Sequence, residues 1–139
     1  MASEKPAAGG GNPAADRQEY LLFLYEPPDL FERMGPEELQ RAIERYRAWT
    51  EELKRDGSFV ASDKLTDGEG RVLRREDEDL RVTDGPYAET KEVIGGYYAV
   101  RATDYGHAVA IASGCPHLDY GGTIEVRQVD RLEPPPEGS

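Results

Sequence analysis

The first strong hydrophobic pattern in the chain is a run of aromatic and aliphatic residues from Tyr20 to Tyr25. An extended backbone places successive side chains on opposite faces, so this run gives both faces of a strand from Glu19 to Tyr25 an apolar surface. Such a strand must be covered on both sides. The consecutive prolines Pro27 and Pro28 predict its end, because proline cannot continue a hydrogen-bonded ladder.

A different pattern, with apolar residues three and four positions apart, predicts a long helix over residues 36–56. Its start is marked by Gly35-Pro36 and two acidic residues, which suit the first turn and the positive end of the helix dipole. Gly57 predicts its end. We expect one face of this helix to pack on a sheet through Leu39, Ala42, Ile43, Tyr46, Trp49, Thr50 and Leu53.

Shorter patterns complete a set of strands and a second helix. The second helix begins with Thr103 as its N-cap and ends before Cys115-Pro116. A turn at residues 67–70 precedes a β-hairpin, since two apolar segments flank an acidic stretch there. The predicted strands of this part of the chain are residues 58–65, 71–74, 80–83, 97–101 and 123–129.

The order of these elements predicts an α+β fold. Strand, helix, strand, hairpin, strand, helix, strand is a split βαβ arrangement with an inserted β-hairpin, typical of a ferredoxin-like antiparallel sheet with two helices on one face. The open face of the sheet would mix aromatic with charged groups, and a second copy of the chain would cover it. We therefore expect a homodimer whose covered face carries Tyr25, Tyr97 or Tyr98, Glu125 and Arg127.

Length and composition limit the classes of protein that the chain can represent. Its 139 residues suit one domain over residues 17–131, between a disordered leader at 1–16 and a disordered tail at 132–139. A net charge of −11, without a basic stripe, argues against direct nucleic-acid binding. The apolar runs are too short to cross a membrane, and no secretory signal opens the chain, so we expect a cytoplasmic protein.

Cysteine and histidine are too scarce to predict a metal centre. Cys115 is the only cysteine, so an internal disulfide and a cysteine-based metal site are both excluded. We expect Cys115 to be a small buried residue, and His107 to be a solvated helix residue. No metal and no other cofactor is expected.

The most specific stretch of the sequence is residues 83–98. Asp84-Gly85-Pro86 predicts a tight turn, in which glycine supplies an unusual backbone conformation. A charged loop follows, and the pair Gly95-Gly96 resembles a hinge that leads into a strand. The stretch is either a ligand-facing loop or an elaborate structural corner.

Several residues are candidates for a site, each with a structural alternative. Asp84 is either a general base in a pocket or a carboxylate that accepts N–H bonds within its own turn. Arg127 could hold a carboxylate ligand, or form an interface ion pair with Glu125. His117 is an acid–base candidate in a loop. The remaining candidate ligand contacts are Tyr25, Tyr87, Glu89, Lys91 and Glu92, of which the last three could instead form an exposed ion-pair network.

The central motif resembles the DGPF branch of the YCII-related superfamily, whose hallmark appears here as Asp84-Gly85-Pro86-Tyr87-Ala88-Glu89-Thr90-Lys91-Glu92. The likeness extends over roughly residues 19–130 and includes Gly95-Gly96-Tyr97-Tyr98 and Gly121-Gly122-Thr123-Ile124-Glu125-Val126-Arg127. The resemblance implies a dimeric α+β barrel. It also implies an accessory or regulatory setting, since similar proteins are encoded beside extracytoplasmic-function sigma factors.

The resemblance bears on individual residues as well. Some YCII-like relatives carry a histidine in the first helix, paired with an aspartate in a proposed proton-transfer dyad. The first predicted helix here has no histidine, and Tyr46 stands at the position that we align with it. The family usually has phenylalanine where this chain has Tyr87, which implies a buried anchor there rather than a chemical group.

Three functions follow as hypotheses, and whether the chain is an enzyme stays open. The first is a homodimer that binds a small polar or aromatic ligand. The second is a lyase or isomerase that uses Asp84 with Tyr46 or His117 for proton transfer, and Arg127 to hold an anionic substrate. The third is a purely structural interaction module in which the motif locks the hairpin.

Overall fold

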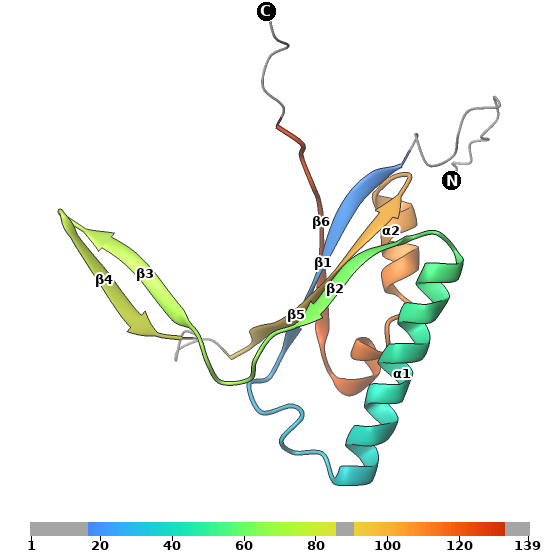
Figure 1. The fold of residues 1–139 in the computed structure, drawn as a ribbon, viewed down its shortest axis with the longest axis horizontal. Coiled ribbons are helices and arrows are strands. Elements are labelled where there is room, and N and C mark those ends of the chain that lie inside the picture. Colours follow the sequence, from blue (N-terminus) through green and yellow to red (C-terminus); the bar gives the residue numbers. More distant parts are fainter. Residues whose placement is uncertain (1–16, 86–90, 133–139) are drawn as a thin grey trace, which may run out of the picture.

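A computed structural model describes residues 17–85 and 91–132 (Figure 1). The predicted leader, residues 1–16, and most of the predicted tail, residues 133–139, lie outside the described part. In chain order the elements are β1 (Gln18–Glu26), α1 (Pro36–Arg55), β2 (Phe59–Lys64), β3 (Arg71–Glu76), β4 (Asp79–Asp84), β5 (Val93–Ala102), α2 (Tyr105–Ala112), the short 3₁₀ helix η3 (Pro116–Tyr120) and β6 (Thr123–Gln128).

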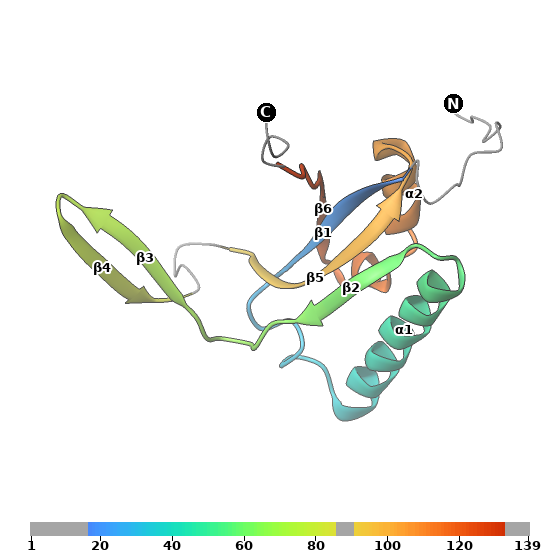
Figure 2. The same cartoon turned by 45° about the horizontal axis from the view of Figure 1, so that its top comes forward.

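Four strands form the main sheet, in the order β2-β5-β1-β6, and every neighbouring pair is antiparallel. Both α-helices and η3 lie on the same side of this sheet (Figures 1 and 2). The α+β, ferredoxin-like fold predicted from the order of elements is therefore confirmed.

The core lies between the sheet and the helices. Alternate residues of β1 point into it, and the two faces of the strand differ because only one of them meets the helices. From α1, Trp49 and Leu53 contact the sheet, and Trp49 packs edge-on against Tyr98 with ring centroids 4.7 Å apart. The other buried members of this cluster are Tyr20, Leu22, Leu24, Val100, Ala102, Ala108, Ala112 and Cys115.

The ends of the helices follow from local sequence. Helix α1 has Gly35 at its N-cap and Pro36 in its first turn, and it is followed by Gly57 at a φ of 77°, a left-handed conformation that suits glycine. Both ends agree with the prediction. The N-cap of α2 is Asp104 rather than Thr103, because the Asp104 carboxylate accepts a 2.8 Å hydrogen bond from the backbone N–H of His107.

The outer face of the sheet, opposite the helices, carries the mixture of residues that the sequence predicts. Phe23 of β1 is half-buried and lies between Tyr97 of β5 and Glu125 of β6 in the strand register. Tyr98 points into the core instead, so Tyr97 is the tyrosine of that pair on the outer face. The homodimer that would cover this face stays a prediction.

Strands β3 and β4 form a separate two-stranded sheet that projects from the body of the domain (Figure 1). Leu73, Leu80 and Val82 share one of its faces and are 61%, 53% and 51% exposed. At the base of this hairpin the backbone N–H of Gly85 donates to the carbonyl of Gly70, at 2.8 Å.

Within the described residues, neither helix combines the length and the apolar composition that a membrane-spanning segment needs.

Candidate functional site

The candidate site begins with a buried carboxylate at the end of β1. Glu26 follows Tyr20, Leu22 and Leu24 on the face of β1 that points into the core, and it is only 3% exposed. Sequence reasoning missed it, because the predicted strand from Glu19 to Tyr25 stops one residue short of Glu26, beside Pro27. The two-residue alternation that starts at Tyr20 was the signal that could have found it.

Gly95 makes room for this carboxylate. A β-carbon on residue 95 would lie 2.3 Å from the Glu26 carboxyl carbon, far inside van der Waals contact. The register of β1 and β5 shifts here, since Leu24 pairs with Gly96 but Tyr25 pairs with Ile94. Gly95 is thus the extra residue of a β-bulge, a feature that re-aims side chains next to it.

The predicted glycine hinge is corrected in its position, because the pair lies within a strand and not in front of it. Gly95 and Gly96 both lie inside β5, and neither has the left-handed φ that favours glycine. A β-carbon on Gly96 would lie 2.9 Å from the carbonyl oxygen of Asp63 in β2. Both positions need glycine for space. Gly85 also lacks a left-handed φ, contrary to the predicted turn geometry.

His117 is the second buried ionisable group of the site, at 1% exposure in η3 rather than in an open loop. Its Nε2 lies 2.8 Å from the Tyr25 carbonyl oxygen, which can only accept, so Nε2 carries a hydrogen. Burial lowers the pKa of His117, against the opposing effects of this carbonyl and of Glu92. The ring is therefore neutral, and its Nδ1 accepts the hydroxyl hydrogen of Tyr46 at 2.8 Å.

A second glycine accommodates this imidazole. A β-carbon on Gly122 would lie 2.2 Å from both Cδ2 and Nε2 of His117. The preceding Gly121 ends η3 with a φ of 84°. Each buried ionisable side chain of the site thus packs against a glycine that no other residue could replace without a shift of its neighbours.

The environment of Glu26 favours its protonated form. Burial raises the pKa of its carboxyl from 4.5 to about 7. The charge of Lys64 acts to lower this pKa, and the charge of Asp67 acts to raise it. Its Oε1 lies 3.9 Å from His117 Nε2, beyond hydrogen-bond distance. Among the described residues none donates a hydrogen bond to this carboxylate. Burial also raises the pKa of Tyr46, which stays a phenol and acts as a donor.

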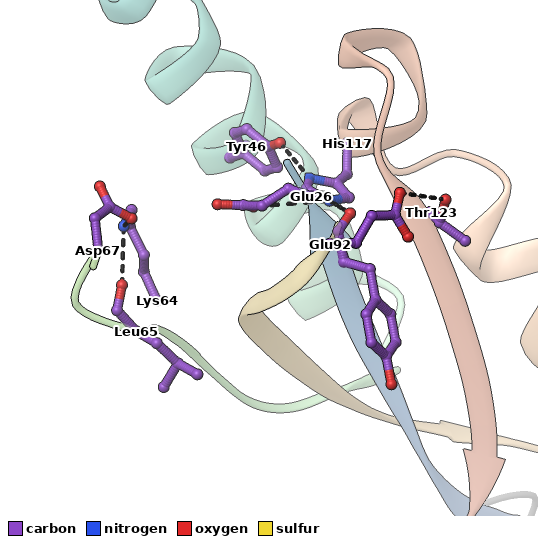
Figure 3. A network of polar contacts seen from close by, with 9 residues as sticks. Glu26, Tyr46, Lys64, Leu65, Asp67, Glu92, His117 and Thr123 are labelled. Carbon is purple, nitrogen blue, oxygen red and sulfur yellow. Dashed lines mark hydrogen bonds and ion pairs between the residues drawn. The ribbon is translucent and has the colours of Figure 1, made fainter. Parts of the chain in front are cut away.

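A small cavity of about 80 Å³ adjoins Glu26. On its rim the Lys64 ammonium donates to Asp67 Oδ1 at 2.8 Å and to the Leu65 carbonyl at 2.9 Å. Figure 3 shows Glu26 between this rim and the Tyr46–His117 pair. The cavity is lined by Glu26, Pro28, Leu65, Thr66, Asp67, Gly68, Glu69, Val93, Ile94 and Gly95.

The structure brings two of the predicted catalytic residues together and leaves the third apart. Tyr46 and His117 are hydrogen-bonded to one another, although they are 71 positions apart in sequence. Asp84 lies at the exposed end of β4, where its Oδ1 is 3.6 Å from Arg71 Nη1. No contact among the described residues joins Asp84 to Tyr46 or His117. Its ionic partner among the described residues is therefore across the hairpin, while most of the turn that follows Asp84 lies outside the described residues, so its hydrogen bonds within that turn stay a prediction.

The other predicted ligand contacts are divided between two places. Glu92 lies near the buried site, since its charge acts to raise the pKa of His117, and it accepts a 3.4 Å hydrogen bond from the Thr123 hydroxyl, whereas Lys91 is exposed. On the outer face of the sheet, Glu125 accepts a 2.9 Å hydrogen bond from the Tyr25 hydroxyl and lies 3.7 Å from Arg127 Nη1. The remaining two candidates, Tyr87 and Glu89, lie outside the described residues.

The described residues offer no cluster of three His, Cys, Asp or Glu side chains that could hold a metal ion. Cys115 is buried, as predicted, and burial raises the pKa of its thiol to about 11. His107 is not simply solvated, because its Nδ1 accepts a 3.0 Å hydrogen bond from the backbone N–H of Thr103.

Two comparisons bear on identity. No curated protein matches this chain. The family model of the YCII-related domain matches residues 18–133, which include every helix and strand described above. The narrower DGPF branch stays a prediction that rests on the central motif. The chain belongs to the YCII-related domain family.

Proposed function

We propose that this YCII-related domain binds a small polar molecule in the cavity beside Glu26. One observation carries the proposal: a carboxylate that is 3% exposed forms part of the cavity wall, and no described residue donates a hydrogen bond to it. No fully buried side-chain oxygen of the described residues lacks a partner, so the unpartnered Glu26 oxygens face the open space of the cavity that this residue lines. A bound molecule with hydrogen-bond donors would supply the missing partners.

The homodimer is part of this proposal. The outer face of the sheet carries half-buried Leu21, Phe23, Tyr25 and Tyr97, and neither of the helices in the described part of the chain covers it. A second copy packed against this face would remove that apolar surface from water. Arg127 and Tyr25 would then lie at the interface, where an anionic ligand could also bind. The accessory or regulatory setting rests on the resemblance of the central motif alone.

A second candidate function, proton transfer of the lyase or isomerase type, is favoured by the pKa of Glu26. A carboxyl with a pKa of about 7 exists in both protonation states at neutral pH, as a general acid–base group requires. Glu26 would remove a proton from the bound molecule and return it to another atom. The Tyr46–His117 pair would hold the surroundings of the carboxylate in place. In this proposal Glu26 takes the role of general base that the sequence predicts for Asp84.

A ligand screen followed by NMR tests the binding function. Small polar molecules would be titrated into the ¹⁵N-labelled full chain, with the backbone amide of Gly95 as the reporter. Binding in the cavity should shift this signal saturably in the wild type and in Glu44→Gln, which removes an exposed carboxylate on α1. Glu26→Gln should weaken the same binding. A ligand that binds both variants equally would contradict the proposed site.

Proton transfer has its own readout. A molecule that binds in the cavity would be incubated with the protein in D₂O, and deuterium incorporation would be followed by mass spectrometry. The wild type should incorporate deuterium faster than Glu26→Gln. Equal rates would eliminate catalysis by Glu26 and leave binding intact.

A further inference from the structure

We propose that the cavity beside Glu26 selects a small cationic group, an ammonium or an amidinium, rather than an anion. The inference rests on the proposed binding function and concerns the chemical class of the ligand. It departs from the anionic ligand that Arg127 suggests, because Arg127 lies on the outer face of the sheet and does not line this cavity.

The lining of the cavity is acidic. Three carboxylates contribute to it, from Glu26, Asp67 and Glu69, and none of its other lining residues carries a positive charge. Lys64 stands next to the rim, but its ammonium is bound to the Asp67 carboxylate and to the Leu65 carbonyl. It therefore offsets about one of the three negative charges that the lining carries once Glu26 is ionised. An anion would meet the uncompensated remainder.

Glu26 supplies the independent observation that points to a ligand. It is 3% exposed, it lines the cavity, and no described residue donates a hydrogen bond to its carboxylate. The nearest ring nitrogen, His117 Nε2, donates to the Tyr25 carbonyl instead. His117 is kept neutral by burial and so provides no balancing charge. A ligand cation would provide both the charge and the donors, and an amidinium could donate two parallel bonds.

The size of the cavity restricts the group to a few heavy atoms. A volume of about 80 Å³ compares with about 10–15 Å³ for the space that one water molecule needs on the same measure. The walls also include apolar side chains from Pro28, Leu65, Val93 and Ile94. An ammonium or amidinium with a short methyl or methylene stem fits this combination of a charged end and apolar walls.

Binding should depend on pH because the cation requires ionised Glu26. The groups that face this carboxylate are His117 from η3, Lys64 from β2, Asp67 from the rim and Tyr46 from α1, whose phenol stays neutral. Glu92, next to His117, adds negative charge. Affinity for a cation should therefore rise as the pH increases through about 7, and binding should release a proton.

Three probes of nearly equal shape test the inference: acetamidinium, acetamide and acetate. Each would be titrated at pH 8 into the ¹⁵N-labelled full chain, with Gly95 as the reporter. We expect acetamidinium to shift this amide saturably, acetate to leave it unchanged, and acetamide to bind at least tenfold more weakly than the cation. Glu26→Gln should weaken acetamidinium binding at least tenfold, whereas Glu44→Gln should bind as the wild type does.

A second variant keeps the inference testable if Glu26→Gln does not fold. Glu69→Gln removes a charge at the exposed rim, and it should weaken acetamidinium binding several-fold. Acetate binding at Gly95 without acetamidinium binding would overturn the cation class and leave the proposed binding site standing. Failure of all three probes to shift Gly95 would also overturn the cation class, while the broader ligand screen judges the binding function separately. Equal acetamidinium binding by Glu69→Gln, Glu26→Gln and the wild type would overturn both the cation class and the proposed binding site.

Discussion

The Glu26 carboxyl group lies directly against the α-carbon of Gly95, and a β-carbon on residue 95 would lie 2.3 Å from its carboxyl carbon. One residue brings the charge into the core and the other, by having no side chain, makes the space for it. The two positions should therefore behave as a unit on mutation.

Gly95→Ala should destabilise the protein by about 1–3 kcal/mol, because the added methyl group overlaps the carboxylate in a packed region. The measurement is urea unfolding followed by circular dichroism. Gly106→Ala is the matched control, since its β-carbon meets nothing closer than 3.5 Å, and it should be neutral or stabilising.

The coupling between the two positions can be measured directly. Glu26→Ala removes the group that the new methyl would overlap, so Gly95→Ala should cost much less in that background. Equal costs in the two backgrounds would show that the overlap with Glu26 is not the cause.

The stability of the protein should depend on pH through Glu26. The folded-state pKa of about 7 exceeds the ordinary value of 4.5, so the folded chain holds a proton that the unfolded chain releases between these pH values. The free energy of unfolding should fall by about 3 kcal/mol for this group as the pH rises through that window. Glu26→Gln lacks this loss, so its stability advantage over the wild type should grow from pH 4.5 to pH 8.

Urea unfolding of both proteins at pH 4.5, 6 and 8 measures this difference. His117 acts in the opposite direction, since its lowered pKa removes stability as the pH falls below 6.5, but it is present in both proteins and cancels to first order. Glu44→Gln should show a constant difference from the wild type. A constant difference for Glu26→Gln as well would mean that Glu26 titrates normally.

Tyr46→Phe should cost about 1–3 kcal/mol of stability, because it leaves the buried Nδ1 of His117 without a donor. Thermal and urea unfolding at pH 8 measure the loss. The control is Tyr120→Phe, whose hydroxyl accepts a 3.4 Å bond from Arg45 at an exposed site on the helix side of the sheet, and which should change stability by less than about 0.5 kcal/mol. Similar effects of the two substitutions would contradict the network around His117.

The proposed homodimer can be tested at Phe23. Phe23→Asp places a carboxylate next to Glu125 on the outer face and should convert a wild-type dimer into a folded monomer, as judged by light scattering and circular dichroism. Ile43→Asp, at a 40% exposed apolar position on α1, should stay dimeric. A monomeric wild type would contradict the proposed interface.

Cys115 should react slowly with iodoacetamide at pH 8, because the thiol is buried and its pKa is raised to about 11. Mass spectrometry would follow the alkylation with and without urea, and unfolding should accelerate it strongly. Ser113→Cys in a Cys115→Ala background places a thiol at an exposed position and should react rapidly. Fast alkylation of native Cys115 would show that its pocket opens readily.

Hydrophobic spacing was sufficient to predict the fold. The apolar stripe from Leu39 to Leu53, bounded by Gly35 and Gly57, contains its own start and stop signals, so α1 could be placed nearly to the residue. The N-cap of α2 was one residue out, because Thr103 and Asp104 can both cap a helix and only the backbone geometry distinguishes them.

The site was harder to predict because its residues meet only through the tertiary structure. The charged residues after Asp84 form the most specific motif of the sequence, whereas the buried carboxylate is at the end of the first strand. Tyr46 and His117 were identified as separate candidates, and their contact depends on how η3 packs beside α1. The bulge at Gly95 depends on the pairing of two strands about 70 positions apart, which a local pattern does not specify.

At the base of the hairpin of β3 and β4, the backbone N–H of Gly85 donates a hydrogen bond to the carbonyl of Gly70. This hydrogen bond closes the base of the hairpin, and it can form whatever the length of the hairpin beyond it. The hairpin forms a sheet of its own and pairs with none of β1, β2, β5 and β6. A longer, shorter or different hairpin should therefore leave the strand register of the main sheet unchanged. The junction between Gly70 and Gly85 is thus a point at which the fold can accept foreign sequence.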